Sequence, residues 1–197
     1  EAFSQKNINC SIEESIERFR PVAQAAKAAG IAVRGAISCA VGCPYEGDIA
    51  PERVALVARL MRDIGVEHVG VADTIGVGTP LKVQRALHAT LQYYSVDEVS
   101  GHCHDTYGMA LANTLATLEM GIWHFDTSVA GLGGCPYAKG ATGNVASEDV
   151  VYMLQGMGIE TGIDLGKMLD AGQFISDFLG RKPHSRAANA LLAKRLG

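Results

Sequence analysis

The segment VDEVSGHCH (residues 96–104) is separated by one residue, Asp105, from the segment TYGMALANTLATLEMG (residues 106–121). This pair of segments decides the fold class. The first segment is short and too apolar for a strand that faces water, and the second has the length and pattern of a helix. A buried strand followed at once by a helix predicts one unit of a parallel sheet, because helices connect and cover such strands.

The same strand–helix unit recurs on both sides of this pair, at a spacing of roughly 30 residues. We expect strands at 31–38, 66–74, 96–104 and 122–130, and helices at 51–65, 79–94, 106–121 and 147–158. An opening helix at 11–29 begins with Ser11 and Glu14, which have the spacing of a capping box. The alternation predicts right-handed crossovers and a parallel sheet covered by helices.

Two architectures fit these units, a small doubly wound sheet and half of an eight-stranded barrel. A complete barrel of this kind has about 250 residues, and this chain has 197. We therefore predict an α/β fold that is the C-terminal half of a TIM (β/α)8 barrel with extra C-terminal helices. Residues 1–160 are the expected partial barrel, and residues 161–197 are the expected helical extension.

The composition excludes several classes of protein. The net charge is −4 without a basic stripe, so nothing predicts a nucleic-acid partner, and no long apolar run predicts a membrane span. The five cysteines are odd in number and scattered, which favours a reducing compartment over a disulfide framework. Cys39 and Cys43 lack the CxxC spacing of a metal or redox pair. The first residues do not form a signal peptide, and we expect sequence upstream of them.

His102 and His104 lie two residues apart at the end of the third predicted strand. Alternate residues of a strand point to the same face, so the two imidazoles project together and Cys103 points the other way. Two neutral imidazoles in one polar space are suited to a divalent metal. Hydrogen-bonded histidines that fill the interior of a barrel are the alternative.

Other reactive residues also follow predicted strands, where parallel α/β folds gather their active sites. Asp73 ends the second strand, and Cys135 lies in the glycine-rich loop 131–144 after the fourth. A loop thiol near a cation could give or take a proton, whereas a merely flexible or phosphate-cradling loop is the alternative. Asn144, at the end of this loop, could complete a metal site or cap the next helix.

For three further residues the sequence predicts a less specific role. Asp105 and Asp126 could orient metal ligands as outer partners, and ordinary structural hydrogen bonding explains them equally well. His68 is expected on the strand face opposite Asp73, packed against the helices.

Five motifs closely resemble hydroxymethylglutaryl-CoA lyase, and together they extend over almost the whole chain, from about residue 1 to about residue 180. They are NINCSIEES (7–15), SCAVGCPYEG (38–47), ADTIGVGTP (72–80), GHCHDTYGMALAN (101–113) and VAGLGGCPYAKGATGN (129–144). The HxHD element is shared with a wider superfamily that includes isopropylmalate and homocitrate synthases. The cysteine-containing loop is the specific part, because those relatives generally lack it.

The resemblance implies a TIM-barrel enzyme that cleaves 3-hydroxy-3-methylglutaryl-CoA to acetyl-CoA and acetoacetate in leucine degradation and ketone-body formation. It further implies a Mg²⁺ or Mn²⁺ cofactor, an acyl-CoA substrate, a dimer of the intact enzyme, and a location in the bacterial cytoplasm or the mitochondrial matrix. The residue roles that it implies are metal ligation by His102, His104 and Asn144, catalysis by Cys135 and Asp73, and outer support from Asp105 and Glu148.

The chain also departs from the family pattern. The family's first barrel strand supplies an Arg-Asp pair, in which the Asp binds the metal and the Arg polarises the substrate carbonyl, and no Arg-Asp-Gly motif occurs here. Ala36 stands where many relatives have Tyr. We therefore expect little activity from this chain alone. A non-catalytic half-barrel that binds a metal or a CoA ester is one alternative, and a related acyl-CoA-dependent synthase is another.

Overall fold

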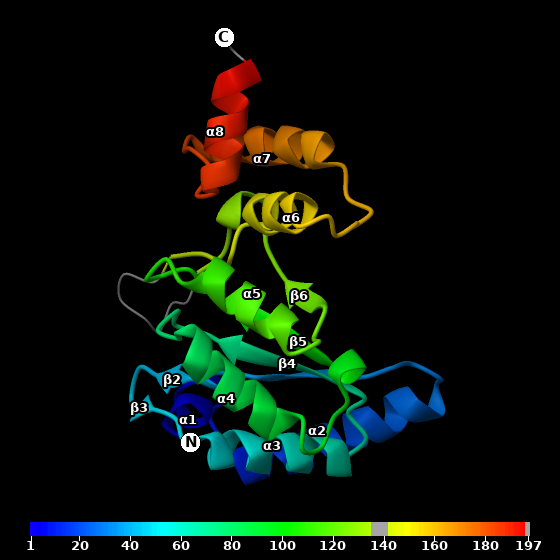
Figure 1. The fold of residues 1–197 in the computed structure, drawn as a ribbon. Helices are drawn as coiled ribbons and strands as arrows, with labels where there is room; N and C mark the ends of the chain where they lie inside the picture. The colour runs from blue at the N-terminus through cyan, green and yellow to red at the C-terminus, as the bar shows by residue number, and fades with distance from the viewer. Residues whose placement is uncertain (135–141, 196–197) are drawn as a thin grey trace.

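The computed structural model describes residues 1–134 and 142–195 of the chain. Its central feature is a parallel sheet with the strand order β1-β4-β5-β6 (Figure 1). The strands are β1 Arg34–Ile37, β4 His68–Asp73, β5 Val99–Cys103 and β6 His124–Asp126. Within the described residues the sheet ends at β1 and β6 without closing, as expected for part of a barrel.

Helices connect the strands and cover one face of the sheet, where α3 packs on β1, α4 on β4 and α5 on β5 (Figure 1). The helices are α1 Ala2–Ile8, α2 Ile12–Ala28, α3 Pro51–Asp63, α4 Pro80–Thr90, α5 Ala110–Glu119, α6 Ser147–Gly156, α7 Leu165–Leu179 and α8 Arg186–Arg195. Two 3-10 turns, η1 Val96–Glu98 and η2 Val129–Gly131, flank β5 and β6. The predicted α/β alternation is confirmed. In the part of the chain that the structure describes, no helix has both the length and the apolar character of a membrane span.

The hydrophobic core lies between the sheet and these helices. Val69 and Val99, on the two central strands, are 0% and 1% exposed. Gly101 of β5 lets α5 approach closely, because a Cβ at this position would lie 3.1 Å from the Thr117 side chain. Complete burial of a valine or leucine side chain contributes roughly 2 kcal/mol, so this apolar layer holds the sheet against the helices.

The opposite face of the sheet is polar. An ideal Cβ at Gly70 of β4 would lie 3.1 Å from the Arg34 guanidinium, 3.3 Å from Ser100 Oγ and 3.6 Å from the Asp126 carboxylate. These four positions therefore share one face, although they come from four different strands. This polar face is the one that would look into the interior of a barrel.

His68 also lies on the polar face. It is in register with Arg34, and its ring centroid lies 6.3 Å from that of His124. The expectation that His68 packs against the helices is wrong, because the alternation along β4 turns Val69 toward them instead.

The third strand–helix unit differs from its predicted boundaries. Residues 96–98 form η1, so the strand begins only at Val99. The helix begins at Ala110, since the Asp105 carboxylate accepts a hydrogen bond from Ala110 N (2.9 Å) and caps the first turn. The predicted loop after β1 contains a small antiparallel hairpin, β2 Gly42–Cys43 with β3 Gly47–Asp48.

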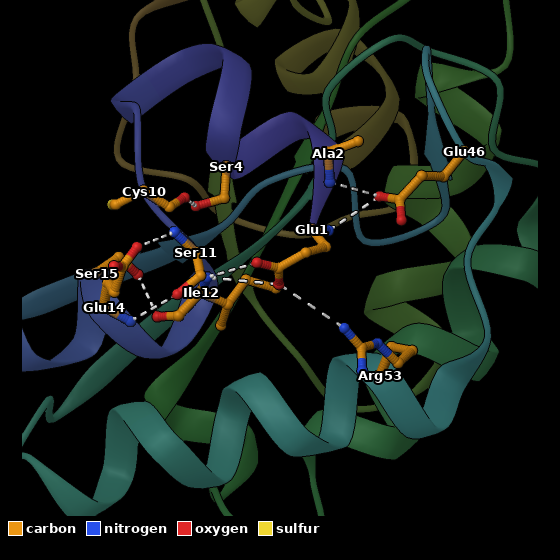
Figure 2. Close-up of polar contacts among 10 residues, drawn as sticks. All are labelled: Glu1, Ala2, Ser4, Cys10, Ser11, Ile12, Glu14, Ser15, Glu46 and Arg53. Carbon is orange, nitrogen blue, oxygen red and sulfur yellow. Dashed lines mark hydrogen bonds and ion pairs between the residues drawn. The ribbon is translucent and has the colours of Figure 1, made fainter.

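Side chains near the start of the chain hold α1, α2 and the hairpin together (Figure 2). Ser11 Oγ accepts from Glu14 N (3.0 Å) and Glu14 Oε2 accepts from Ser11 N (2.8 Å), which confirms the predicted capping box. Glu46, in the turn of the hairpin, accepts from Ala2 N (3.1 Å) at the start of α1. The hairpin is therefore fixed to the first helix of the chain.

Asp149 of α6 organises the C-terminal helices. Its Oδ1 accepts hydrogen bonds from Ser185 Oγ (2.8 Å) and Ala187 N (2.7 Å), and these bonds anchor the first turn of α8. Helix α7 packs against α6 and η2. The division of the chain at residue 160 stays a prediction.

Candidate active site

The candidate site lies at the carboxyl end of β5, where a returning segment pairs with the strand. Val145 N donates to Cys103 O (2.9 Å), and this bond places Asn144 directly opposite His104 in an antiparallel bridge. Directly opposed residues of an antiparallel pair share a face, so the His104 and Asn144 side chains are neighbours. The site is thus assembled from residues about 40 positions apart by backbone pairing alone.

The two histidines project together, as the spacing predicts. Their rings are stacked, with centroids 5.5 Å and planes 30° apart. Cys103 points to the opposite, helix-covered side, where burial raises the pKa of its thiol to about 12. Burial also lowers the pKa of His104, and the neighbouring His102 acts in the same direction. His104 is therefore a neutral imidazole near pH 7, the form that binds metals.

Two buried atoms at the bridge have no hydrogen-bond partner among the described residues: His104 Nδ1 and Asn144 Oδ1. The Asn144 amide is oriented by its Nδ2, which donates to Leu132 O (2.9 Å) and leaves Oδ1 as the free acceptor. An unpaired buried polar atom costs about 1–3 kcal/mol, and a divalent cation would satisfy both atoms at once. The residues present therefore fit such an ion.

This donor set is only part of a metal site. Within residues 1–134 and 142–195, no group of three or more His, Cys, Asp or Glu side chains could hold an ion by itself. A cation at His104 and Asn144 would need further ligands. His102, whose ring is stacked on that of His104, is the nearest candidate of the right chemistry.

The two ends of the glycine-rich loop, at Leu132 and Asn144, lie beside the bridge. Its two stems meet where Asn144 N donates to Leu132 O (3.3 Å). Gly133 has a φ of +95°, and a Cβ there would lie 2.5 Å from Asn144 Nδ2, so only glycine allows the amide to sit so close. Cys135, the predicted catalytic thiol, lies outside the described residues.

Asp73, the last residue of β4, lies on the helix-covered side of the sheet, in register with Cys103. Its Oδ1 accepts from Val77 N (3.1 Å) and its Oδ2 from Gly78 N (2.9 Å). Burial raises its pKa, and the hydrogen bonds from these backbone groups counteract part of that effect. Through these hydrogen bonds, the Asp73 carboxylate fixes the backbone of the loop that follows β4.

Of the three residues expected as outer partners, Asp126 lies 3.2 Å from His102 Nδ1, whereas Glu148 and Asp105 are hydrogen-bonded to the backbone. Glu148 is fully buried, and both of its carboxylate oxygens accept from Ala130 N (2.9 and 3.0 Å). Burial raises the pKa of Glu148. Asp105 caps α5 through Ala110 N. Both therefore fix the backbone around the site rather than contacting His102 or His104 in the described contacts.

Arg34 is the site residue that the sequence reasoning missed. It comes from β1, donates to Ser100 Oγ (2.7 Å) and forms an ion pair with Asp126, which in turn lies 3.2 Å from His102 Nδ1. A charged residue within the predicted buried strand IAVRGAIS was the available signal. Its partner could not be found without the order of the strands.

The sequence model of the HMGL-like family matches residues 1–175. The mitochondrial hydroxymethylglutaryl-CoA lyase of Rattus norvegicus is 57% identical over 96% of this chain and 58% of its own length. The crystal structure of hydroxymethylglutaryl-CoA lyase from Pseudomonas aeruginosa is 57% identical with a TM-score of 0.94, over 98% of this chain and 65% of that one. A lyase of this kind from Acinetobacter baumannii, solved with coenzyme A and 3-methylmalate, is 32% identical over 94% of this chain and 61% of that one, with a TM-score of 0.89.

These likenesses agree with the architecture. The described sheet and helices superpose on part of each related lyase, which confirms the predicted partial barrel. The chain spans about 58% of the length of the rat relative. Since the family model and the identities cover nearly all of its residues, the chain belongs to the HMGL-like family.

Proposed function

We propose that the protein carrying this chain is a hydroxymethylglutaryl-CoA lyase, which cleaves 3-hydroxy-3-methylglutaryl-CoA to acetyl-CoA and acetoacetate. The observation that carries the proposal is the pair of unpaired buried atoms, His104 Nδ1 and Asn144 Oδ1, beside the stems of the cysteine-containing loop. The presence of these atoms supports a cation site at the carboxyl end of β5, where barrel enzymes have their active sites.

The proposed ligands are His102, His104 and Asn144, with Mg²⁺ or Mn²⁺ as the cation. A bound cation would supply Lewis-acid stabilisation of the substrate oxyanion. The two imidazoles stack on one face, and His104 is held neutral by burial, so both are prepared to bind. The bridge fixes the backbone positions of His104 and Asn144, and the bond from Asn144 Nδ2 to Leu132 O orients the amide before a ligand arrives, which reduces the entropy cost of binding.

The reaction needs a base and an acid on this framework. A base takes the proton of the tertiary hydroxyl, the adjacent carbon–carbon bond breaks, and its electron pair passes to the acetyl-CoA enolate. We assign protonation of that enolate to the Cys135 thiol, whose ordinary pKa of about 8.5 suits a donor at neutral pH. The family resemblance makes Asp73 our proposed contributor to proton transfer, although its carboxylate lies on the helix-covered side of the sheet, opposite His102 and His104.

The substrate and the assembly follow from the same family resemblance. The related Acinetobacter baumannii protein was solved with coenzyme A, which supports an acyl-CoA substrate here. We further propose a dimer of the intact enzyme, located in the cytoplasm if the source is bacterial and in the mitochondrial matrix if it is eukaryotic.

The test is the cleavage rate of the complete protein, measured as acetoacetate formed from 3-hydroxy-3-methylglutaryl-CoA, with and without the Cys135→Ser substitution. We expect a loss of several orders of magnitude, equivalent to about 4 kcal/mol or more, with cation affinity nearly unchanged. The matched control is His88→Ala, at an exposed position of α4, which should keep the wild-type rate.

Three outcomes would contradict the proposed mechanism or favour another function. An unchanged rate in Cys135→Ser would remove the thiol from the mechanism. Condensation of an acyl-CoA with an oxo acid, without cleavage, would favour a related synthase. Cation or CoA-ester binding by the complete protein without any turnover would favour a non-catalytic binding role. For the 197-residue chain alone we expect little cleavage, since the Arg-Asp-Gly motif of the family's first strand does not occur in it.

A further inference from the structure

A polar connection crosses all four strands of the sheet on its polar face. Arg34 of β1 donates to Ser100 Oγ of β5 (2.7 Å) and pairs with the Asp126 carboxylate of β6. Strand β4 lies between them in the sheet and carries glycine at the crossing point. A Cβ on Gly70 would lie 3.1 Å from Arg34 Nη2, so the missing side chain leaves the space through which the guanidinium passes.

Asp126 is the point where this connection meets the candidate site. Its Oδ2 pairs with Arg34 and also lies 3.2 Å from His102 Nδ1. Burial raises the pKa of Asp126, but the hydrogen bonds from His102 and Arg34 outweigh it and hold the pKa below its ordinary value. The ion pair with the Arg34 guanidinium identifies the Asp126 side chain as a carboxylate, and a carboxylate can only accept hydrogen bonds.

We infer that Asp126, itself held by Arg34, is a positioning residue for His102. Since the carboxylate accepts, Nδ1 of His102 must carry the ring hydrogen, and the lone pair of the neutral ring is left on Nε2. The same contact fixes the rotation of the ring. A carboxylate behind a ligating histidine typically improves metal affinity by 10–100-fold. The role toward the cation rests on the proposed function, whereas the tautomer of His102 does not.

An ion pair that served only to join the strands would have different requirements. It would need Arg34 and Asp126 but would place no constraint on the His102 ring. The Ser100 hydroxyl provides an internal comparison, because it holds Arg34 without contacting His102 in the described contacts. Changes at Ser100 and Asp126 should therefore separate strand joining from ring positioning.

The first experiment is ¹⁵N NMR of the histidine side chains in the metal-free chain, with His102 assigned through the His102→Gln variant. We expect the Nδ1–H tautomer of His102 in the wild type and in Ser100→Ala. In Asp126→Ala we expect a shift toward the Nε2–H tautomer. An Nε2–H tautomer in the wild type, or an unchanged tautomer in Asp126→Ala, would overturn the inference.

The second experiment measures Mn²⁺ affinity of the same variants by electron paramagnetic resonance. Asp126→Ala should bind Mn²⁺ 10–100-fold more weakly than the wild type, and Ser100→Ala should remain within about threefold of it. Equal affinities of Asp126→Ala and the wild type would overturn the positioning role. If the wild type itself bound no Mn²⁺, the proposed cation site would fail, while the tautomer result would still decide the inference.

If Asp126→Ala does not fold, a second variant, Arg34→Gln, tests the same inference. Arg34→Gln keeps the Asp126 carboxylate and removes only the group that holds it, so it is a milder change. We expect the Nδ1–H tautomer to persist in Arg34→Gln with increased ring mobility and weaker Mn²⁺ binding. Wild-type ring order and wild-type affinity in Arg34→Gln would contradict the part of the inference that concerns Arg34.

Discussion

His104 and Asn144 lie opposite each other in an antiparallel bridge, and each leaves one buried side-chain atom without a hydrogen-bond partner among the described residues. The bridge is a backbone feature, so it forms whether or not a ligand is bound. Because these two atoms are buried without hydrogen-bond partners, they lower the stability of the unliganded fold. A ligand that satisfied both atoms would therefore recover stability that the unliganded chain lacks.

Binding of a cation should stabilise the chain through these two residues. For the wild type we expect the unfolding temperature to rise with Mg²⁺ or Mn²⁺ concentration, because a ligand that binds only the folded state adds RT ln(1 + [L]/Kd) to its stability. In His104→Ala this rise should be lost. Thermal unfolding at several cation concentrations checks the result, with His88→Ala as the control that keeps the rise. An equal rise in His104→Ala would place the cation elsewhere.

Asp73 should prove to be structurally important. Its two carboxylate oxygens accept from Val77 N and Gly78 N, and an asparagine can accept at only one of these positions. We expect Asp73→Asn to lower the free energy of unfolding by about 2 kcal/mol, measured by urea denaturation. A variant with full stability and no cleavage activity in the complete protein would instead support a role in proton transfer alone.

Helix α7 depends on a glycine at its contact with Glu148. A Cβ at Gly172 would lie 2.5 Å from Glu148 Oε1, and the Glu148 carboxylate is fully buried and bonded to Ala130 N. We therefore expect Gly172→Ala to destabilise the chain by about 1–3 kcal/mol. The matched control is Gly156→Ala in α6, where a Cβ would meet nothing within 4 Å. Equal unfolding free energies of the two variants would show that α7 is not held at this contact.

The ion pair of Arg62 and Glu98 should make stability depend on pH in the acid range. Arg62 Nη2 lies 2.6 Å from Glu98 Oε2, and its hydrogen bond, followed by those from Ser95 N and Oγ, lowers the pKa of Glu98 from 4.5 to about 2. A lowered pKa in the folded state gives stability that is complete above the unfolded value and is lost as the pH falls toward the folded one.

Glu98→Gln should therefore be less stable than the wild type near pH 7, by about 1 kcal/mol because partial exposure screens the pair. This difference should shrink as the pH falls below about 4.5. Urea unfolding from pH 3 to 7 measures it, and Glu67→Gln, at an exposed position, should match the wild type throughout. A difference that stayed constant over this range would refute the assignment.

The alternation of strands and helices was predictable because each unit carries its own local signals. Ser11 and Glu14 formed the expected capping box, and His102 and His104 share a face because alternation along a strand is a local property. The hairpin at Gly42–Asp48 was missed, since its two strands have only two residues each and show no periodicity.

Relations between distant strands could not be read from the sequence. His68 lies on the strand face opposite Asp73, as expected, but that face is the polar one. Alternation along a strand gives the relative orientation of its residues and does not say which face meets the helices. The contact of Arg34 with Asp126 joins residues 92 positions apart and depends on strand order, which the sequence does not state. The polar face became visible only when the four strands were placed side by side.

The central claim is that a divalent cation binds at His102, His104 and Asn144. Its most direct test is paramagnetic broadening by Mn²⁺ of the side-chain NMR signals of the metal-free chain. We predict that substoichiometric Mn²⁺ broadens the signals of these three side chains first, while those of His88, at an exposed position of α4, stay sharp. Broadening centred on another part of the chain, or none at millimolar Mn²⁺, would contradict the account.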